Sequence, residues 1–221
     1  MESLNRGEIT PFHTFDPMQG LLVSELADLL DTIRQGGPDT LPELATTHPD
    51  AARSLETQGI ILSEGRSSIE LDDATLLFIA LRATTDDGGP AEPLDRGISM
   101  ERLGRFPIGT GNAITYLREF LIPENADDQG GQLLLQLDSG LRNETRGHDN
   151  LSFGFGGMAL HGWLTAPEVT FLRTYLQKSA WKVAQKEPLD GGVREIVRHL
   201  LIVLKTAEKR DVGILMRAHG D

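Results

Sequence analysis

Apolar residues recur at helical spacing along most of this chain and alternate in only a few short stretches. No periodic pattern occurs over residues 1–14, which we expect to be irregular. Asp16-Pro17-Met18-Gln19 then has the form of a helix start, with an aspartate cap, a proline in the first turn and a glutamine three residues after the cap. Leucines follow on one face until Gly36-Gly37-Pro38, so the pattern predicts a helix that begins at Asp16.

Two shorter helices are expected between residues 40 and 59, and the apolar runs within residues 60–71 predict a β-hairpin. Three helices followed by a hairpin resemble a winged helix-turn-helix over residues 16–72. One hypothesis is therefore a DNA-binding regulator, but a recognition helix needs Arg or Lys side chains, and residues 40–59 hold only Arg53. Binding of a protein or peptide, or a helical lobe that only packs on the rest of the chain, fits this composition better.

Glycine, proline and polar residues dominate residues 84–97, where we expect a linker. Before it, the apolar segment 76–81 fits a helix or a buried strand equally well. After it the pattern predicts, in order, helices over 99–105 and 112–122, with Asn112 as a cap, and strands over 132–137 and 151–155.

The clearest local signal of the chain is Gly162-Trp163-Leu164-Thr165-Ala166-Pro167-Glu168-Val169. Thr165 can cap a helix, Pro167 lies in the first turn and Glu168 stands three residues after the cap, which makes a capping box. We expect this helix to run to about Trp181. A long helix with an apolar face over 193–204 and a short strand at 214–216 complete the predicted order.

This order of strand, capping box, helix, turn, long helix and closing strand resembles the C-terminal half of small bacterial proteins of the YfbM-like kind. Proteins of similar layout occur among toxin-immunity families. The likeness covers residues 150–221, about a third of the chain, and its motif is mainly the helix start described above. It implies a bacterial accessory or immunity-like protein and supplies no catalytic residues.

These elements together predict an α+β protein in two lobes. The first lobe, residues 1–83, is helical and winged-helix-like, and residues 84–97 link it to the second. The second lobe, residues 98–221, holds a small β-sheet covered by helices.

Charge is unevenly distributed along the 221 residues, whose formal net charge is −12. Residues 1–97 carry 18 acidic and 6 basic side chains, whereas residues 98–221 carry 15 of each. An acidic surface repels phosphate backbones, which argues against nucleic acid as a partner. If the acidic lobe does not dock within the chain, we expect it to bind a basic protein.

The one basic surface is expected at residues 170–210, which hold nine basic and four acidic side chains. Lys178, Lys182 and Lys186 would align on one face if the helix extended that far. We expect these lysines, with the aromatic side chain of Trp163, to form a binding surface for a partner; the alternative for Trp163 is a place in the core.

The polar loop over residues 142–150, which leads into the strand predicted from residue 151 and has His161 at the far end of that strand, offers candidate chemistry. His148, Asp149 and His161, with Glu144, could bind zinc or another divalent metal and run a metal-dependent hydrolysis. Their spacing matches no metal motif, and a polar loop with a hydrogen-bonded histidine is the alternative. Without a recognisable catalytic constellation, the leading prediction is non-catalytic protein binding with no cofactor.

The chain contains no cysteine, so neither disulfides nor thiolate metal sites are available. No apolar run reaches the length of a membrane span, and the N-terminus lacks the apolar core of a signal peptide. We therefore expect a cytoplasmic protein that does not engage a membrane.

Overall fold

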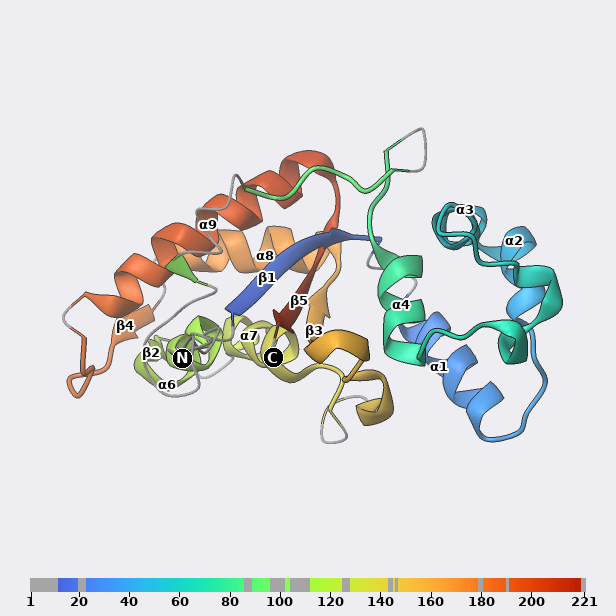
Figure 1. The fold of residues 1–221 in the computed structure, drawn as a ribbon. Coiled ribbons are helices and arrows are strands. Elements are labelled where there is room, and N and C mark those ends of the chain that lie inside the picture. Colours follow the sequence, from blue (N-terminus) through green and yellow to red (C-terminus); the bar gives the residue numbers. More distant parts are fainter. Residues whose placement is uncertain are drawn as a thin grey trace, which may run out of the picture.

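The computed structural model describes residues 12–19, 23–85, 89–95, 102–103, 112–124, 128–142, 145, 147–178, 181–189 and 191–219. Its elements confirm the predicted α+β class (Figure 1). In chain order they are β1 (Phe12–Met18), α1 (Val23–Arg34), α2 (Leu44–Thr47), α3 (Pro49–Glu56), α4 (Asp73–Leu81), α6 (Ala113–Phe120), β2 (Leu121–Pro123), α7 (Gln129–Ser139), β3 (Met158–Leu164), α8 (Ala166–Gln177), β4 (Trp181–Val183), α9 (Gly192–Arg210) and β5 (Gly213–His219).

The main sheet has three antiparallel strands in the order β1-β5-β3, so the first and last strands of the described residues lie side by side. Phe12 pairs with His219 and Met18 with Gly213 across β1 and β5. The register of β3 against β5 shifts between Leu160 and Gly162, which makes His161 the extra residue of a bulge. A second sheet consists of the short strands β2 and β4.

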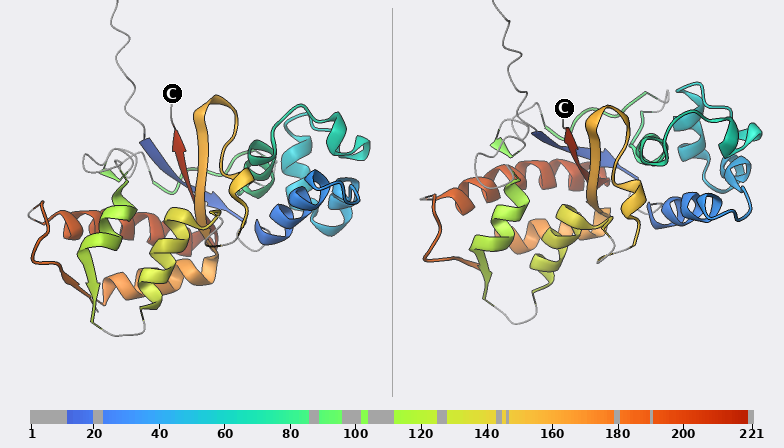
Figure 2. Two further views of the ribbon diagram at one scale, coloured as in Figure 1. Left: turned by 90° about the horizontal axis from the view of Figure 1, so that it is seen from below. Right: turned by 60° about the horizontal axis from the view of Figure 1, so that its bottom comes forward.

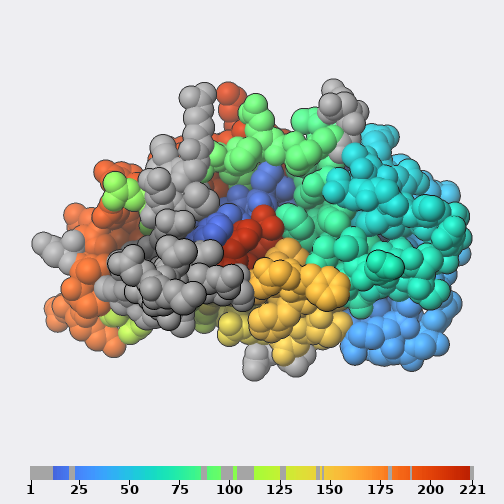
Figure 3. All heavy atoms as spheres, in the orientation of Figure 1, coloured from blue at the N-terminus to red at the C-terminus, as the bar shows by residue number. Residues whose placement is uncertain are grey.

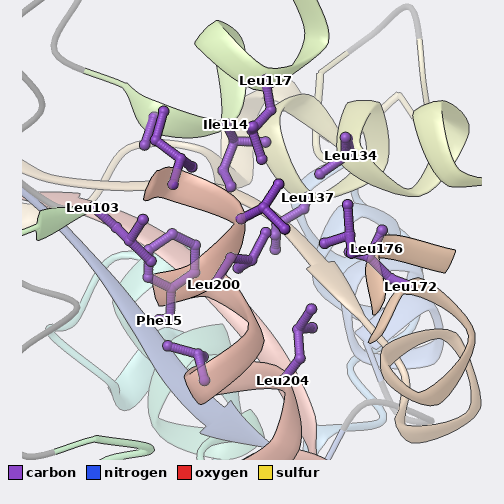
Figure 4. Close-up of a cluster of buried hydrophobic side chains, with 14 of the residues drawn as sticks. Phe15, Leu103, Ile114, Leu117, Leu134, Leu137, Leu172, Leu176, Leu200 and Leu204 are labelled. Carbon is purple, nitrogen blue, oxygen red and sulfur yellow. The ribbon is translucent and has the colours of Figure 1, made fainter. Parts of the chain in front are cut away.

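The three-stranded sheet is the middle layer between two sets of helices (Figures 1 and 2). Side chains alternate between its faces along each strand. One face packs against α6, α7, α8 and α9, where leucines from all four helices form one cluster that includes Phe15 of β1 (Figure 4). The other face packs against α1 to α4, and its buried contributions are Met18, Leu160, Trp163 and Leu215. Each face of the sheet therefore has its own hydrophobic core.

The predicted helix start at Asp16 is wrong, because Asp16 and Pro17 lie in β1 and α1 begins only at Val23. Pro17 accepts a hydrogen bond from Ala83 N on the side away from β5, so its missing N–H would have pointed away from the ladder. Asp16 pairs with Arg217 of β5 instead of capping a helix, at 2.9 Å between Oδ2 and Nε.

The predicted hairpin over residues 60–71 is also wrong. Short 3-10 helices occupy Leu62–Glu64 and Arg66–Ser68, so the described residues of this region form no wing. The Arg66 guanidinium donates to the carbonyl oxygens of Ile69 and Leu71, at 2.8 and 2.7 Å, and thereby takes acceptors that a hairpin ladder would use. Residues 73–81 form a helix, α4, which Asp72 caps through Thr75 N at 2.8 Å.

Both predicted strands before β3 are corrected. Residues 132–137 belong to α7, which Asp128 caps and whose Leu133, Leu134 and Leu137 are buried at helical spacing. Residues 151–155 form a 3-10 turn and an irregular segment, and β3 starts only at Met158.

In the C-terminal third of the chain, most of the elements predicted from the sequence are confirmed by the structure. The capping box of Thr165 and Glu168 is present, with Thr165 N donating to Glu168 Oε2 at 2.8 Å. The cap by Asn112, the long helix α9 and the closing strand β5 are also confirmed. The helix α8 ends at Gln177, however, and Trp181 begins β4. The helix predicted over 99–105 lies almost entirely outside the described residues.

Described residues of the predicted linker 84–97 are packed rather than extended. Thr84 and Pro90 form a bridge, and Leu94 is only 3% exposed in the core that contains α9. Arg210 of α9 donates to the carbonyl oxygen of Glu92 at 2.5 Å. None of the helices within the described ranges has both the length and the apolar composition of a membrane span.

Candidate functional site

Two phenylalanines project from the segment that precedes β3. We call residues 152–157 the Phe turn. Phe153 is 75% exposed and Phe155 is 69% exposed, which makes them the most exposed large apolar side chains of the described residues. In Figure 3 the yellow-to-orange stretch around the Phe turn lies at the surface, beside the teal helices of the N-terminal layer.

Backbone hydrogen bonds anchor the Phe turn on both sides. Phe155 N donates to Asp72 Oδ2 at 2.9 Å, and Gly154 N donates to Met158 O at 2.9 Å. Gly156 and Gly157 have φ angles of 69° and 74°, a backbone conformation that side-chain-bearing residues rarely adopt. The two exposed rings are therefore presented by a defined turn.

Asp72 has two tasks, because it caps α4 and holds the Phe turn. Burial by itself would raise the pKa of Asp72. The hydrogen bonds from Thr75 and from Phe155 N outweigh burial and keep that pKa below its usual value. The carboxylate consequently stays ionised at neutral pH and ties the turn to the helical layer.

His148 forms a second tie between this segment and the helical layer. Its Nδ1 lies 2.6 Å from Asp31 Oδ2 of α1, and Asn150 Nδ2 donates to Asp31 Oδ1 at 2.7 Å. Burial alone would raise the pKa of Asp31, but the hydrogen bonds from His148, Asn150 and Arg34 lower it further than burial raises it. His148 Nε2 lies 3.5 Å from Asp28 Oδ1, whose side chain is 73% exposed. His148, one of the predicted metal ligands, thus makes a polar contact with α1.

The structure does not bring the predicted metal set together. His161 lies in the bulge of β3, where its Nδ1 is 2.9 Å from Asp138 O, whereas His148 contacts α1. Asp149 is exposed, and Glu144 lies outside the described residues. Across the described ranges, no three His, Asp or Glu side chains are placed to hold a metal ion.

Next to the Phe turn lies a cavity of about 620 Å³, which we call the histidine cavity. Two histidines meet there, since the rings of His13 and His161 are 5.1 Å apart and nearly perpendicular. The remaining lining residues come from α6, α7, β3, β5 and the segments between them, and they are Asn112, Thr115, Arg118, Asp138, Arg142, Phe153, Gly154, Gly157, Met158, Ala159 and Ala218.

Asp138 is the buried acid of the histidine cavity, with a side chain that is 8% exposed. Its Oδ1 accepts hydrogen bonds from Asn112 Nδ2 at 2.5 Å and from Thr115 Oγ1 at 3.1 Å. Its Oδ2 pairs with the guanidinium of Arg118. Residues of α6 and its N-cap therefore neutralise the charge of Asp138 and supply its hydrogen-bond donors.

His161 is held in one neutral tautomer. A carbonyl oxygen only accepts, so the contact with Asp138 O places the proton on Nδ1 and leaves Nε2 as an acceptor. Burial lowers the pKa of His161, the positive charge of Arg142 lowers it further, and the contacts with Asp138 oppose this only in part. The imidazole is consequently an uncharged base at neutral pH.

Two further depressions are lined by charged residues. A groove of about 1060 Å³ runs between β1, α4 and α9, and within it Arg217 pairs with Asp16 and Arg210 with Glu92. Arg82 also lines it, but its Nη2 is buried below the surface and unpaired within the described residues. The charges of this groove are thus mostly compensated or hidden.

The predicted basic surface at 170–210 exists, but in a different form. Arg194, Arg198 and Lys205 of α9 line a shallow pocket of about 390 Å³ with Trp181. The three predicted lysines do not share a helix face, because α8 ends before them; Lys178 and Lys186 are exposed, and Lys182 lies 3.5 Å from Glu124. Trp163 is 1% exposed and belongs to the core, not to a binding surface.

Sequence reasoning missed the exposed phenylalanines and the network of Asp138. Phe153 and Phe155 alternate as buried strand residues would, and only the glycines at 154, 156 and 157 signalled a turn. Asp138 was hidden in a segment assigned to a strand.

Neither a protein-family model, nor a curated protein, nor a solved structure matches this chain. The resemblance to YfbM-like and toxin-immunity proteins therefore stays a prediction. Function must be inferred from the geometry of the molecule.

Proposed function

We propose that this chain is a non-catalytic protein-binding protein, and that the Phe turn is its principal contact. The observation that carries the proposal is the exposure of Phe153 and Phe155 on a turn fixed by Asp72. Aromatic side chains, phenylalanine included, are enriched in protein–protein interfaces relative to the rest of the protein surface. The accessory or immunity-like role that the sequence resemblance implies, in a cytoplasmic setting, is consistent with such a surface.

The two rings can supply substantial binding energy. Full burial of a phenylalanine contributes about 1.5–3 kcal/mol, so both together offer roughly 3–6 kcal/mol before the cost of association. A turn that is already ordered loses little conformational entropy when it binds. These terms favour protein recognition over a merely solvated loop.

Charge next to the Phe turn supports a basic partner. The neighbouring helix α1 carries Asp28 and Glu25, whose side chains are 73% and 65% exposed. The acidic helices α1 to α4 cover the sheet face opposite α8 and α9, so the basic side chains of α9 do not cover them. Complementary charge would orient the partner and speed its approach more than it adds affinity.

The test is capture of partners from a lysate of the native host on immobilised full-length protein. Wild type should retain a basic protein that elutes as salt rises, and the Phe153→Ser/Phe155→Ser double variant should lose it. Phe171→Ser is the matched control, because Phe171 is also exposed, at 39%, but lies on α8. Its capture should equal that of wild type.

Both rings of the Phe turn are exposed, so the double variant should melt within about 0.5 kcal/mol of wild type. Loss of capture would then report lost contact and not unfolding. Equal capture by wild type and the double variant would refute the proposal, as would equal loss with Phe171→Ser.

A further inference from the structure

The histidine cavity holds one guanidinium that no carboxylate of the described residues neutralises. Of the two arginines that line it, Arg118 pairs with Asp138, which leaves Arg142. The Arg142 side chain is exposed at the cavity, and no ion pair joins it to any residue within the described ranges. A guanidinium presents a planar fork of N–H donors that matches a carboxylate in two parallel hydrogen bonds.

The cavity also offers a hydrogen-bond acceptor, Nε2 of His161. His161 Nε2 carries a lone pair, because the contact with Asp138 O fixes the proton on Nδ1. A ligand that satisfies His161 must therefore present a hydrogen-bond donor, for which a hydroxyl is the simplest neutral group.

Part of the cavity lining is apolar. Phe153, Met158, Ala159 and Ala218 contribute carbon surface, and the volume of about 620 Å³ lies within the range of small-molecule clefts. A ligand need not supply a hydrogen-bond donor or a positive charge for Asp138, because Asn112, Thr115 and Arg118 already bind its carboxylate. These contacts also hold α6 against α7.

We propose that the histidine cavity binds a small monocarboxylic acid whose apolar body ends in a hydroxyl group. The carboxylate pairs with Arg142, the hydroxyl donates to His161 Nε2, and the body packs against Phe153 and Met158. This site is separate from protein capture by the Phe turn, although Phe153 borders both.

The probe is 4-hydroxyphenylacetate, titrated into the full chain at neutral pH and followed by calorimetry or by chemical shifts of the imidazole signals. Phenylacetate is the matched ligand that lacks the hydroxyl, and tyramine is the one that replaces the carboxylate with a cation. We expect saturable binding of 4-hydroxyphenylacetate, about fivefold weaker binding of phenylacetate, and no binding of tyramine.

The matched pair of variants is Arg142→Gln and Arg198→Gln. Both replace an exposed arginine, but Arg198 lies on α9, with a side chain that is 70% exposed. Arg142→Gln should weaken 4-hydroxyphenylacetate at least about tenfold, and Arg198→Gln should leave it unchanged. Arg142→Gln should also raise the pKa of His161 in an NMR titration, because the nearby positive charge is removed.

Three results would overturn the assignment. One is the absence of saturable binding by either carboxylate at about 10 mM, a concentration that detects even weak sites. The second is equal affinity of wild type and Arg142→Gln. The third is equal affinity for phenylacetate and 4-hydroxyphenylacetate, which would remove His161 from the site. Because none of these readouts uses the protein partner, they are independent of the capture experiment.

Discussion

Replacing Gly162 with alanine should be strongly destabilising, because α7 crosses β3 at this residue. A β-carbon on Gly162 would lie 1.9 Å from Gln136 O, 2.6 Å from Gly140 N and 2.9 Å from Leu137 O. All three atoms belong to the backbone of α7 or its C-cap. No side-chain rotation can therefore relieve the contact, and the helix itself would have to move.

The distance by which α7 must move determines how much folding stability is lost. A carbon and a carbonyl oxygen approach to about 3.3 Å, so α7 would shift by about 1.4 Å from β3. The helix carries Leu134 and Leu137 into the core that Figure 4 shows, where both are at most 1% exposed. Overpacking costs about 1–3 kcal/mol, and contact with backbone places this case near 3 kcal/mol, which lowers Tm by roughly 6–12 °C.

Urea denaturation followed by tryptophan fluorescence, together with a thermal melt, measures this loss. Gly59→Ala is the control, because Gly59 has a φ of 81° but nothing within 4 Å of an added β-carbon. That variant should lose only the cost of a left-handed conformation, about 1–2 kcal/mol. If the free energy of unfolding fell no more in Gly162→Ala than in Gly59→Ala, the close approach of α7 to β3 would be disproved.

Three further perturbations have defined outcomes. Trp163→Ala should cost about 3–5 kcal/mol in urea denaturation, whereas Phe153→Ala should cost less than about 0.5; equal costs would contradict the assignment of one ring to the core and the other to the surface. Asp31 has a lowered pKa in the folded state, so its stabilisation is present above its usual pKa of 3.8 and is lost as pH falls through the lower folded value; Asp31→Asn should flatten the acid side of a stability–pH curve, and an unchanged curve would refute this. Burial and the charge of Asp128 raise the pKa of Tyr175 to about 12, so its stabilisation is lost as pH rises through that value. Burial also raises the pKa of Tyr116, the other tyrosine of the chain, so Tyr175→Phe should remove one of two phenolate absorbance steps; a titration that keeps both steps would be inconsistent with the assignment.

Local chemistry explains which elements the sequence identified correctly. The capping box at Thr165 and the cap by Asn112 each satisfy helix N–H groups within three residues of the cap. Such signals need no tertiary partner. The apolar face of α9 is likewise read from its own period, and α9 forms as predicted.

Elements that depend on distant partners were misassigned. Asp16-Pro17 has every mark of a helix start, yet its backbone pairs with β5, about 200 residues away in the chain, and Asp16 bonds Arg217 there. The helix α7 carries leucines at helical spacing, but its run was short enough to fit a strand as well. The candidate site depends on tertiary structure in the same way. Arg142 and His161 are recognisable as possible ligand contacts only because the fold places both at the lining of one cavity.

The sequence by itself determined the α+β class, the helix starts at Asn112 and Thr165, and the acidic character of the first half. Only the tertiary structure decided which strands pair, that the sheet lies between two helical layers, and that Phe153 and Phe155 face solvent. The physical reason is range. Caps and helical periods act over a few residues, whereas strand pairing and burial depend on residues that the chain brings together from far apart.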